Sequence, residues 1–218
     1  MTVPFRIFIA DDHEIVRRGL RALLESHPGW EVCGEAKDGR EAVEQVKELR
    51  PDLLLIDVGM PNLNGLDASR QVLTELPSVR VLILTMHESE QIIREVLEVG
   101  ARGFLLKSDA ARDLIAAVEA LQRRTTFFTS SVAEMVLNGY LHRGPNLDRP
   151  LKGRLTPRER EVVQLLAEGK TSKEVAVVLN LSVKTAETHR TNVMRKLNLH
   201  SVADLVRYAV RNRIVQVV

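Results

Sequence analysis

The sequence of 218 residues predicts a doubly wound α/β domain of the flavodoxin type, with a five-stranded parallel sheet, followed by a small all-α domain. In the first half, short apolar runs alternate with segments of helical period, whereas the second half carries helical patterns only. The charge changes along with the pattern: residues 1–124 hold 16 Lys and Arg against 21 Asp and Glu, and residues 125–218 hold 15 against 8. This asymmetry indicates an acidic module joined to a basic one that is suited to nucleic acid.

Five short apolar runs are predicted to form the strands of the sheet. The run LLLID is apolar on both faces, as strands buried inside a parallel sheet are. Alternation of strands and helices implies right-handed crossovers, which place helices on both faces of the sheet. The predicted strands are residues 5–10, 31–36, 53–57, 80–85 and 103–107.

The segments between these runs are predicted to be helices. In EIVRRGLRALLESH (14–27), Ile15, Leu20, Leu23 and Leu24 have the spacing of one helix face. The other predicted helices are 40–49, with apolar Ala42, Val43, Val46 and Leu49, and segments near 65–76, 89–99 and 109–123.

Five polar residues stand at the carboxyl ends of predicted strands, where function collects in such sheets. They are Asp11 and Asp12 after the first strand, Asp57 after the third, Thr85 after the fourth and Lys107 after the fifth. Singly, each has a structural explanation: a helix cap, a hydroxyl bonded to backbone, a surface cation. Together they predict a site in which three carboxylates hold Mg²⁺, Thr85 and Lys107 bind phosphoryl oxygens, and Asp57 is the nucleophile.

The first half resembles the receiver domain of two-component response regulators, a CheY-like fold, from residue 5 to about 123. The stretches that carry the resemblance are DDH (11–13), DVGMPNLNG (57–65), LTMHE (84–88) and GARGFLLK (100–107).

This resemblance implies a role for each residue of the site. Asp57 matches the phosphoacceptor, and Asp11, Asp12 and the backbone carbonyl of Gly59 match the Mg²⁺ ligands. Thr85 and Lys107 match the residues that bind the phosphoryl group. Phe104 stands where the family has an aromatic side chain that turns inward with the threonine on activation; a half-buried strand aromatic is the alternative.

The second half begins with a predicted helix at 129–141 and a segment rich in Pro, Gly, Asn and charge at 142–154, which reads as a linker. The predicted domains are therefore 1–124, a linker region 125–153 containing that helix, and 154–218. Three helix starts follow, with capping residues in TPRE (156–159), TSKE (171–174) and SVAD (201–204).

A further helix is predicted over 182–197, after a cap at Ser182. By its period, Val183, Ala186, Val193 and Leu197 face inward, and Lys184, Thr188, Thr191 and Arg195 face outward with Glu187 beside them. A short capped helix, a turn and this helix, in a segment of net charge +6, are the parts of a helix-turn-helix.

Residues 155–197 closely resemble the LuxR/NarL-type (FixJ-like) DNA-binding domain. The resemblance makes 171–179 the supporting helix and 182–197 the recognition helix. It implies that Lys184, Glu187, Thr188 and Thr191 face the major groove and that Arg190 and Arg195 contact phosphates. Several relatives carry Lys where Glu187 stands, and a carboxylate there favours a cytosine amino group, so the base sequence that is read stays open.

The two resemblances together predict a transcriptional regulator rather than an enzyme. A sensor histidine kinase is expected to phosphorylate Asp57, and the protein is expected to bind promoter DNA as a homodimer. The helix at 201–213, with apolar Val202, Leu205, Val206 and Ala209, is either a dimer seam or ordinary core packing.

Two other classes of function compete with a DNA-binding regulator as the interpretation of this sequence. A haloacid-dehalogenase-like phosphatase also uses a strand-end aspartate, but it needs a second Asp two residues on, where this chain has Gly59. The other class is a regulator whose C-terminal domain binds RNA or protein.

Composition indicates a cytoplasmic protein without a membrane partner. The single cysteine, Cys33, cannot form an internal disulfide and is expected to be a buried free thiol, which fits a reducing compartment. No run approaches the ~18–20 consecutive apolar residues that span a bilayer, and the N-terminus does not read as a signal peptide.

Overall fold

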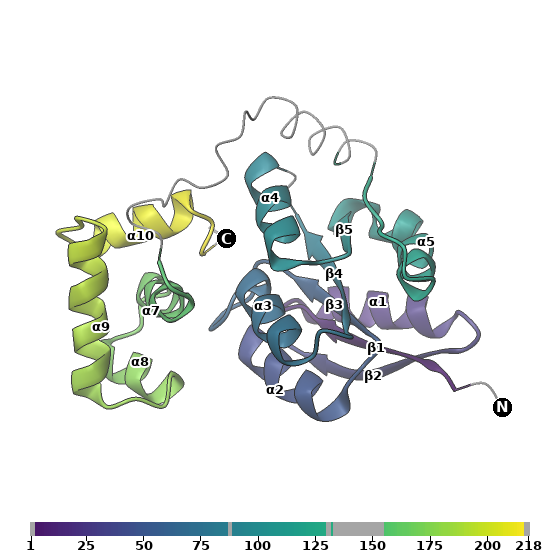
Figure 1. Ribbon diagram of the computed structural model, residues 1–218, viewed down its shortest axis with the longest axis horizontal. Helices are drawn as coiled ribbons and strands as arrows, with labels where there is room; N and C mark the ends of the chain where they lie inside the picture. Colours follow the sequence, from purple (N-terminus) through teal and green to yellow (C-terminus); the bar gives the residue numbers. More distant parts are fainter. Residues whose placement is uncertain (1–2, 87–88, 130–131, 133–154, 216–218) are drawn as a thin grey trace. The chain divides into compact units, whose positions relative to one another are not determined.

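The computed structural model describes residues 3–86, 89–129, 132 and 155–215 (Figure 1). The chain forms two compact units, each described here by itself. The predicted helix at 129–141 and the predicted linker fall almost entirely outside the described residues, so they and the domain boundaries stay predictions. None of the described helices is long and apolar enough to cross a membrane.

The N-terminal unit contains the predicted parallel sheet, with strand order β2-β1-β3-β4-β5. The ladders pair Ala10 of β1 with Ile56 of β3 and Asp57 of β3 with Leu84 of β4, so these strands end at one common edge. The strands are β1 Phe5–Ala10, β2 Trp30–Ala36, β3 Leu53–Asp57, β4 Arg80–Thr85 and β5 Gly103–Leu106.

Helices cover both faces of the sheet: α1 and α5 lie on one face, and α2, α3 and α4 on the other (Figure 1). The strands alternate to match, because Ile7 and Ile9 pack under α1 and α5 while Phe8, also fully buried, points to the opposite face. The helices are α1 Glu14–Glu25, α2 Gly39–Leu49, α3 Gly65–Glu75, α4 Glu90–Val99, the 3₁₀ turn η1 Lys107–Asp109, and α5 Ala110–Gln122.

The predicted inward face of α1 is wrong in part. Leu20 and Leu24 are buried as expected and Val16 packs beside them, but Ile15 is 86% exposed and Leu23 is 36% exposed. The buried stripe runs through residues four apart, and at about 100° per residue Ile15 lies well off that stripe.

The C-terminal unit is a small bundle of four described helices, α7 Pro157–Ala167, α8 Ser172–Val178, α9 Val183–Lys196 and α10 Val202–Arg211. Both predicted capping boxes are confirmed, because Thr156 and Thr171 each accept from the backbone of the glutamate three residues on. Ser182 and Ser201 cap α9 and α10 in the same manner. Each cap removes an otherwise unsatisfied donor, worth about 1 kcal/mol.

The inward residues of α9 are confirmed with one exception. Ala186 and Val193 are buried and Leu197 packs against the core, but Val183 is 40% exposed. Val183 is the first residue of the helix and lies at its exposed start.

Ordinary core packing accounts for part of the apolar face of α10, and the dimer seam stays a prediction. Leu205 and Ala209 are buried in the unit's own core, as ordinary packing requires. Val202 is 48% exposed and Val206 is half-buried, so the core does not fully bury these two side chains.

Candidate functional site

The site lies at the carboxyl edge of the parallel sheet, where a lysine bridges two buried carboxylates. Asp11 is 0% exposed and Asp57 is 3% exposed. The ammonium nitrogen of Lys107 lies 2.6 Å from Oδ2 of Asp11 and 3.1 Å from Oδ2 of Asp57. Three predicted site residues from different strand ends therefore converge on one point.

Burial controls the protonation of this cluster. Burial raises the pKa of Asp57 from its ordinary value of 3.8 to about 6. The ammonium of Lys107 opposes the rise, whereas the negative charges of Asp11 and Asp12 add to it. For Lys107, burial lowers the pKa, but the carboxylates of Asp57 and Asp11 raise it by more, so Lys107 stays charged at neutral pH.

Asp12 is the solvent-exposed member of the acidic group. Nδ1 of His13 lies 2.7 Å from Oδ1 of Asp12 and 3.3 Å from Oδ1 of Asp11. His13 was not among the predicted site residues; its position directly after the two aspartates was the available signal. The possible ligand atoms of Asp11, Asp12 and His13 lie within 4.8 Å of one another.

The donor set fits a hard divalent cation. Lys107 contacts Asp11 and Asp57, and Asp12 adds a third carboxylate, so the edge carries an excess of negative charge that Lys107 alone does not neutralise. Carboxylate and carbonyl oxygens are the ligands such ions prefer. Gly59, whose carbonyl was predicted to join the set, lies two residues beyond Asp57 in the loop after β3.

Thr85 and Phe104 are both fully buried, at 0% exposure. Thr85 ends β4, and Phe104 lies in β5 with its backbone N–H donating to the carbonyl oxygen of Phe127 at 3.0 Å. The Phe104 ring is therefore fully buried rather than half-buried, and a structural role in the core stays the alternative. Its predicted role as a switch stays a prediction.

Two residues that the sequence reasoning missed hold the site in shape. Arg17 of α1 donates from Nη1 to the backbone carbonyl of Asp11 at 2.7 Å, while its Nε lies 3.3 Å from Glu35. Gly65 begins α3 directly against β3: a Cβ at Gly65 would lie 1.9 Å from the carbonyl oxygen of Asp57. The glycine of the NLNG stretch was the signal for this close approach.

The second candidate site is the exposed face of α9. Lys184, Glu187, Thr188, Thr191 and Arg195 are all exposed, as predicted for groove-facing residues. Arg190 is half-buried, because it lies four residues from buried Ala186 on the edge of the inward face. Arg190 is thus less open than the other predicted DNA contacts.

The threonine hydroxyls on α9 donate within the helix. Oγ1 of Thr188 donates to the carbonyl of Lys184 and Oγ1 of Thr191 donates to the carbonyl of Glu187, each at 2.9 Å. Outward, these side chains therefore offer a methyl group and hydroxyl lone pairs. Such groups suit contact with a thymine methyl or a base amino group.

Gly65→Ala is expected to lower the free energy of unfolding by roughly 1–3 kcal/mol, because α3 must move away from β3 to admit the methyl group. Urea unfolding followed by fluorescence of Trp30, the only tryptophan, reports this unit within the full chain. Gly19→Ala is the control: Gly19 is an exposed position of α1 with nothing within 4 Å of the added Cβ, and the change should stabilise the unit by about 0.5–1 kcal/mol. Equal effects of the two changes would contradict the close approach.

Asp57→Asn is expected to stabilise the metal-free unit at neutral pH. The folded pKa of Asp57 is about 6 against 3.8 normally, so ionisation weakens the folded state as pH rises through this interval. Relative to the unchanged protein, the free energy of unfolding of the variant should be higher by up to about 3 kcal/mol above pH 7 and should not differ below about pH 4. Unfolding in the presence of EDTA across this range tests it; a pH-independent difference would show that burial of the charge is not the cause.

Comparison with known protein families agrees with both halves of the structure. The family model described as "Response regulator receiver domain" matches residues 7–119. The family model described as "Bacterial regulatory proteins, luxR family" matches residues 153–209, which include α7, α8 and α9.

Similar proteins share this two-part organisation along nearly their whole length. The transcriptional regulatory protein LiaR of Bacillus subtilis is 39% identical over 210 residues, which cover 96% of this chain and 99% of LiaR. The oxygen regulatory protein NreC of Staphylococcus carnosus is 36% identical, covering 96% of this chain and 98% of NreC.

Among solved structures, RcsB of Salmonella enterica serovar Typhimurium, bound to the promoter P1flhDC in the presence of the phosphomimetic BeF₃⁻, is similar to this chain. The identity is 31% and the TM-score 0.58, covering 94% of this chain and 97% of that one. The chain therefore belongs to the NarL/LuxR family of two-component response regulators, in which a receiver domain is joined to a LuxR-type helix-turn-helix, and it is a DNA-binding transcriptional regulator rather than an enzyme.

Proposed function

We propose that Asp57 is the phosphoacceptor of this regulator and that its phosphorylation controls promoter binding by α9. The observation that carries the proposal is the buried Asp11–Lys107–Asp57 cluster. A carboxylate that is nearly inaccessible, yet held next to a cation and an acidic pair, is unfavourable as a purely structural device. The same arrangement is well suited to accept a phosphoryl group.

Asp11, Asp12, Asp57 and the carbonyl of Gly59 are the residues proposed to hold Mg²⁺. The ion would supply positive charge to the phosphoryl oxygens. The excess negative charge at this edge supports the assignment, because ammonium groups other than Lys107 make no ion pair with Asp11 or Asp57 among the described residues.

The phosphoryl donor is proposed to be the phosphohistidine of a sensor histidine kinase. A carboxylate oxygen of Asp57 forms the new bond to phosphorus, the phosphorus–nitrogen bond of the donor breaks, and the histidine nitrogen keeps the electron pair. Above pH 6 most of Asp57 is ionised and needs no base to remove a proton. Lys107, already 3.1 Å from Oδ2, is positioned to follow the charge onto the phosphoryl oxygens.

The switch is proposed to run through Thr85, Lys107 and Phe104. Phosphorylation adds roughly −1.5 to −2 charges at the sheet edge, which attracts the hydroxyl of Thr85 and the ammonium of Lys107. The position of the buried Phe104 ring would then depend on the position of Thr85. The full burial of both residues supports a coupled arrangement of this pair.

The output is proposed to be binding of cytoplasmic promoter DNA by a homodimer, whose two α9 helices read half-sites about one helical turn apart. Lys184, Glu187, Thr188 and Thr191 would contact bases, with Arg190 and Arg195 on phosphates. The RcsB structure bound to a promoter in the presence of a phosphomimetic supports this order of events by similarity.

Asp57→Asn is expected to abolish phosphorylation by acetyl phosphate in the presence of Mg²⁺, because the amide lacks the nucleophilic oxygen. Phosphate-affinity electrophoresis of the full chain measures the product. Asp113→Asn, which changes a half-buried carboxylate on α5 that pairs with Arg112, is the matched control and should be phosphorylated like the unchanged protein. Labelling of the Asp57→Asn variant at the normal rate would refute the assignment.

Thr188→Ala and Arg195→Ala are expected to weaken DNA binding in different ways. Loss of the Thr188 methyl and oxygen should change affinity at particular base pairs by roughly 1 kcal/mol and shift the selected sequence. Loss of Arg195 should weaken binding to every sequence and reduce the salt dependence by about one charge. Selection from random duplexes, followed by titration at several salt concentrations, separates the two; identical profiles would contradict this division of roles.

A further inference from the structure

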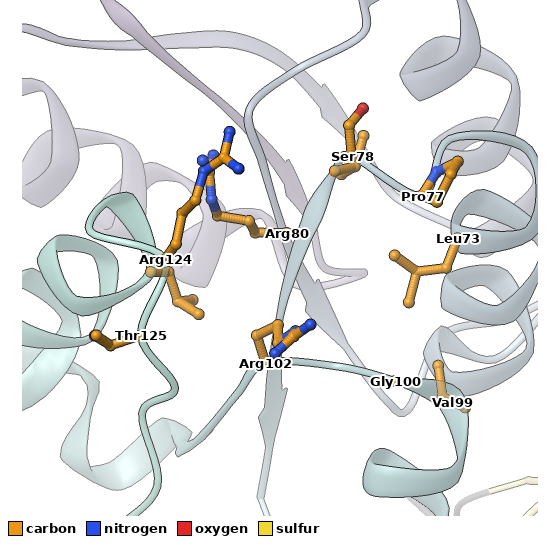
Figure 2. Close-up of a pocket in the computed structure, with 11 residues that line it drawn as sticks. Leu73, Pro77, Ser78, Arg80, Val99, Gly100, Arg102, Arg124 and Thr125 are labelled. Carbon is orange, nitrogen blue, oxygen red and sulfur yellow. The ribbon is translucent and has the colours of Figure 1, made fainter.

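A pocket of about 380 Å³ opens at the amino edge of the sheet, at the opposite end of the strands from Asp57. Three arginines line it: Arg80 at the start of β4, Arg102 just before β5 and Arg124 just after α5. In Figure 2 the side chains of Arg80 and Arg124 lie on one side of Arg102, and the apolar side chains of Leu73, Pro77 and Val99 lie on the other. The pocket thus combines a cationic side with an apolar wall.

The backbone holds these arginines in defined places. The N–H of Arg102 donates to the carbonyl of Val81 at 3.1 Å, and its own carbonyl accepts from Phe127 at 3.0 Å. The guanidinium of Arg80 lies 5.5 Å from the centroid of the Phe5 ring. The N–H of Arg124 donates to the carbonyl of Leu121 at 2.9 Å, at the end of α5. These contacts fix the backbone of Arg102 and Arg124 beside the pocket, and the guanidinium of Arg80 also donates from Nη1 to the carbonyl of Asp52 at 3.3 Å.

Unlike most other arginines of the receiver, the three pocket arginines have no carboxylate partner among the described residues. Within residues 3–86 and 89–129, no ion pair within 4.0 Å involves Arg80, Arg102 or Arg124. By contrast, the arginines that do pair with a carboxylate are Arg17, Arg18, Arg21, Arg70, Arg94, Arg112 and Arg123. In a receiver of net charge −5, three guanidinium groups without a carboxylate partner around one pocket favour an anion.

We propose that this pocket binds a phosphorylated small molecule. Guanidinium groups match phosphate oxygens in geometry and stay charged at every relevant pH. The volume lies at the lower end of the range of ligand pockets, which suits a nucleoside phosphate better than a peptide or a duplex. Its phosphates would lie against Arg80, Arg102 and Arg124, and its organic part would cover Leu73, Pro77 and Val99.

Isothermal titration calorimetry of the full chain without divalent cations tests the proposal, with ADP and inorganic pyrophosphate as probes. ADP is expected to bind more tightly than pyrophosphate, because only ADP covers the apolar wall. Arg102→Gln and Arg124→Gln should each weaken ADP binding at least tenfold. Arg123→Gln is the matched control: it is exposed beside Arg124, pairs with Glu119 and does not line the pocket, so it should stay within twofold.

Several outcomes would overturn the proposal. The first is that neither probe binds at millimolar concentration. The second is that the Arg102→Gln/Arg124→Gln double variant binds ADP as tightly as the unchanged protein. The third is that Arg123→Gln loses as much ADP affinity as the pocket variants. If Lys184→Gln weakened ADP binding instead, the anion would be bound by α9 and not by the pocket. Trp30 fluorescence in urea shows that each variant is folded, and because Arg102 and Arg124 are both exposed, either single variant tests the site alone.

Discussion

Two carboxylates, Asp11 and Asp57, are buried at one edge of the receiver sheet with a single ammonium group between them. This arrangement leaves at least one uncompensated negative charge in a region of low dielectric, and the raised pKa of Asp57 is the direct consequence. An edge of this kind gains free energy from any added cation and responds strongly to any added anion. Its unfavourable resting state is therefore what makes it sensitive to metal and phosphoryl groups.

The rest of the receiver holds those charges together against their repulsion. The parallel register brings the ends of β1, β3 and β4 to the same level, so that residues distant in sequence meet without long loops. Gly65 lets α3 approach the carbonyl of Asp57, and Arg17 anchors the carbonyl of Asp11 from α1. The apolar strands supply the stability against which this electrostatic cost is set.

The features of the fold that depend on local residue patterns were predicted correctly from the sequence. The five strands, their shared carboxyl edge and the helix caps follow from periodicity and from residue types at fixed spacing. Sequence reasoning failed where burial depends on what packs opposite: Ile15 and Val183 are apolar, yet both side chains are exposed. Gly65 was missed because only the folded chain reveals how close the Asp57 carbonyl comes. The arginine pocket was missed because its members are far apart in sequence. The roles of the individual site residues stay predictions.

The C-terminal domain bears on how a signal can act. The inward side chains of α9 are buried in a core formed by residues of that domain, and the first turn of α9 is capped by Ser182. The outward hydroxyls of Thr188 and Thr191 are already bonded within the helix. The surface of α9 is thus held in shape by contacts within its own domain, so a signal need not act by folding α9. What a single copy lacks is a second recognition helix at a fixed spacing. Under the proposed function, phosphorylation therefore acts most directly on the pairing of two intact domains, which raises affinity for a two-part site without changing any contact that α9 makes.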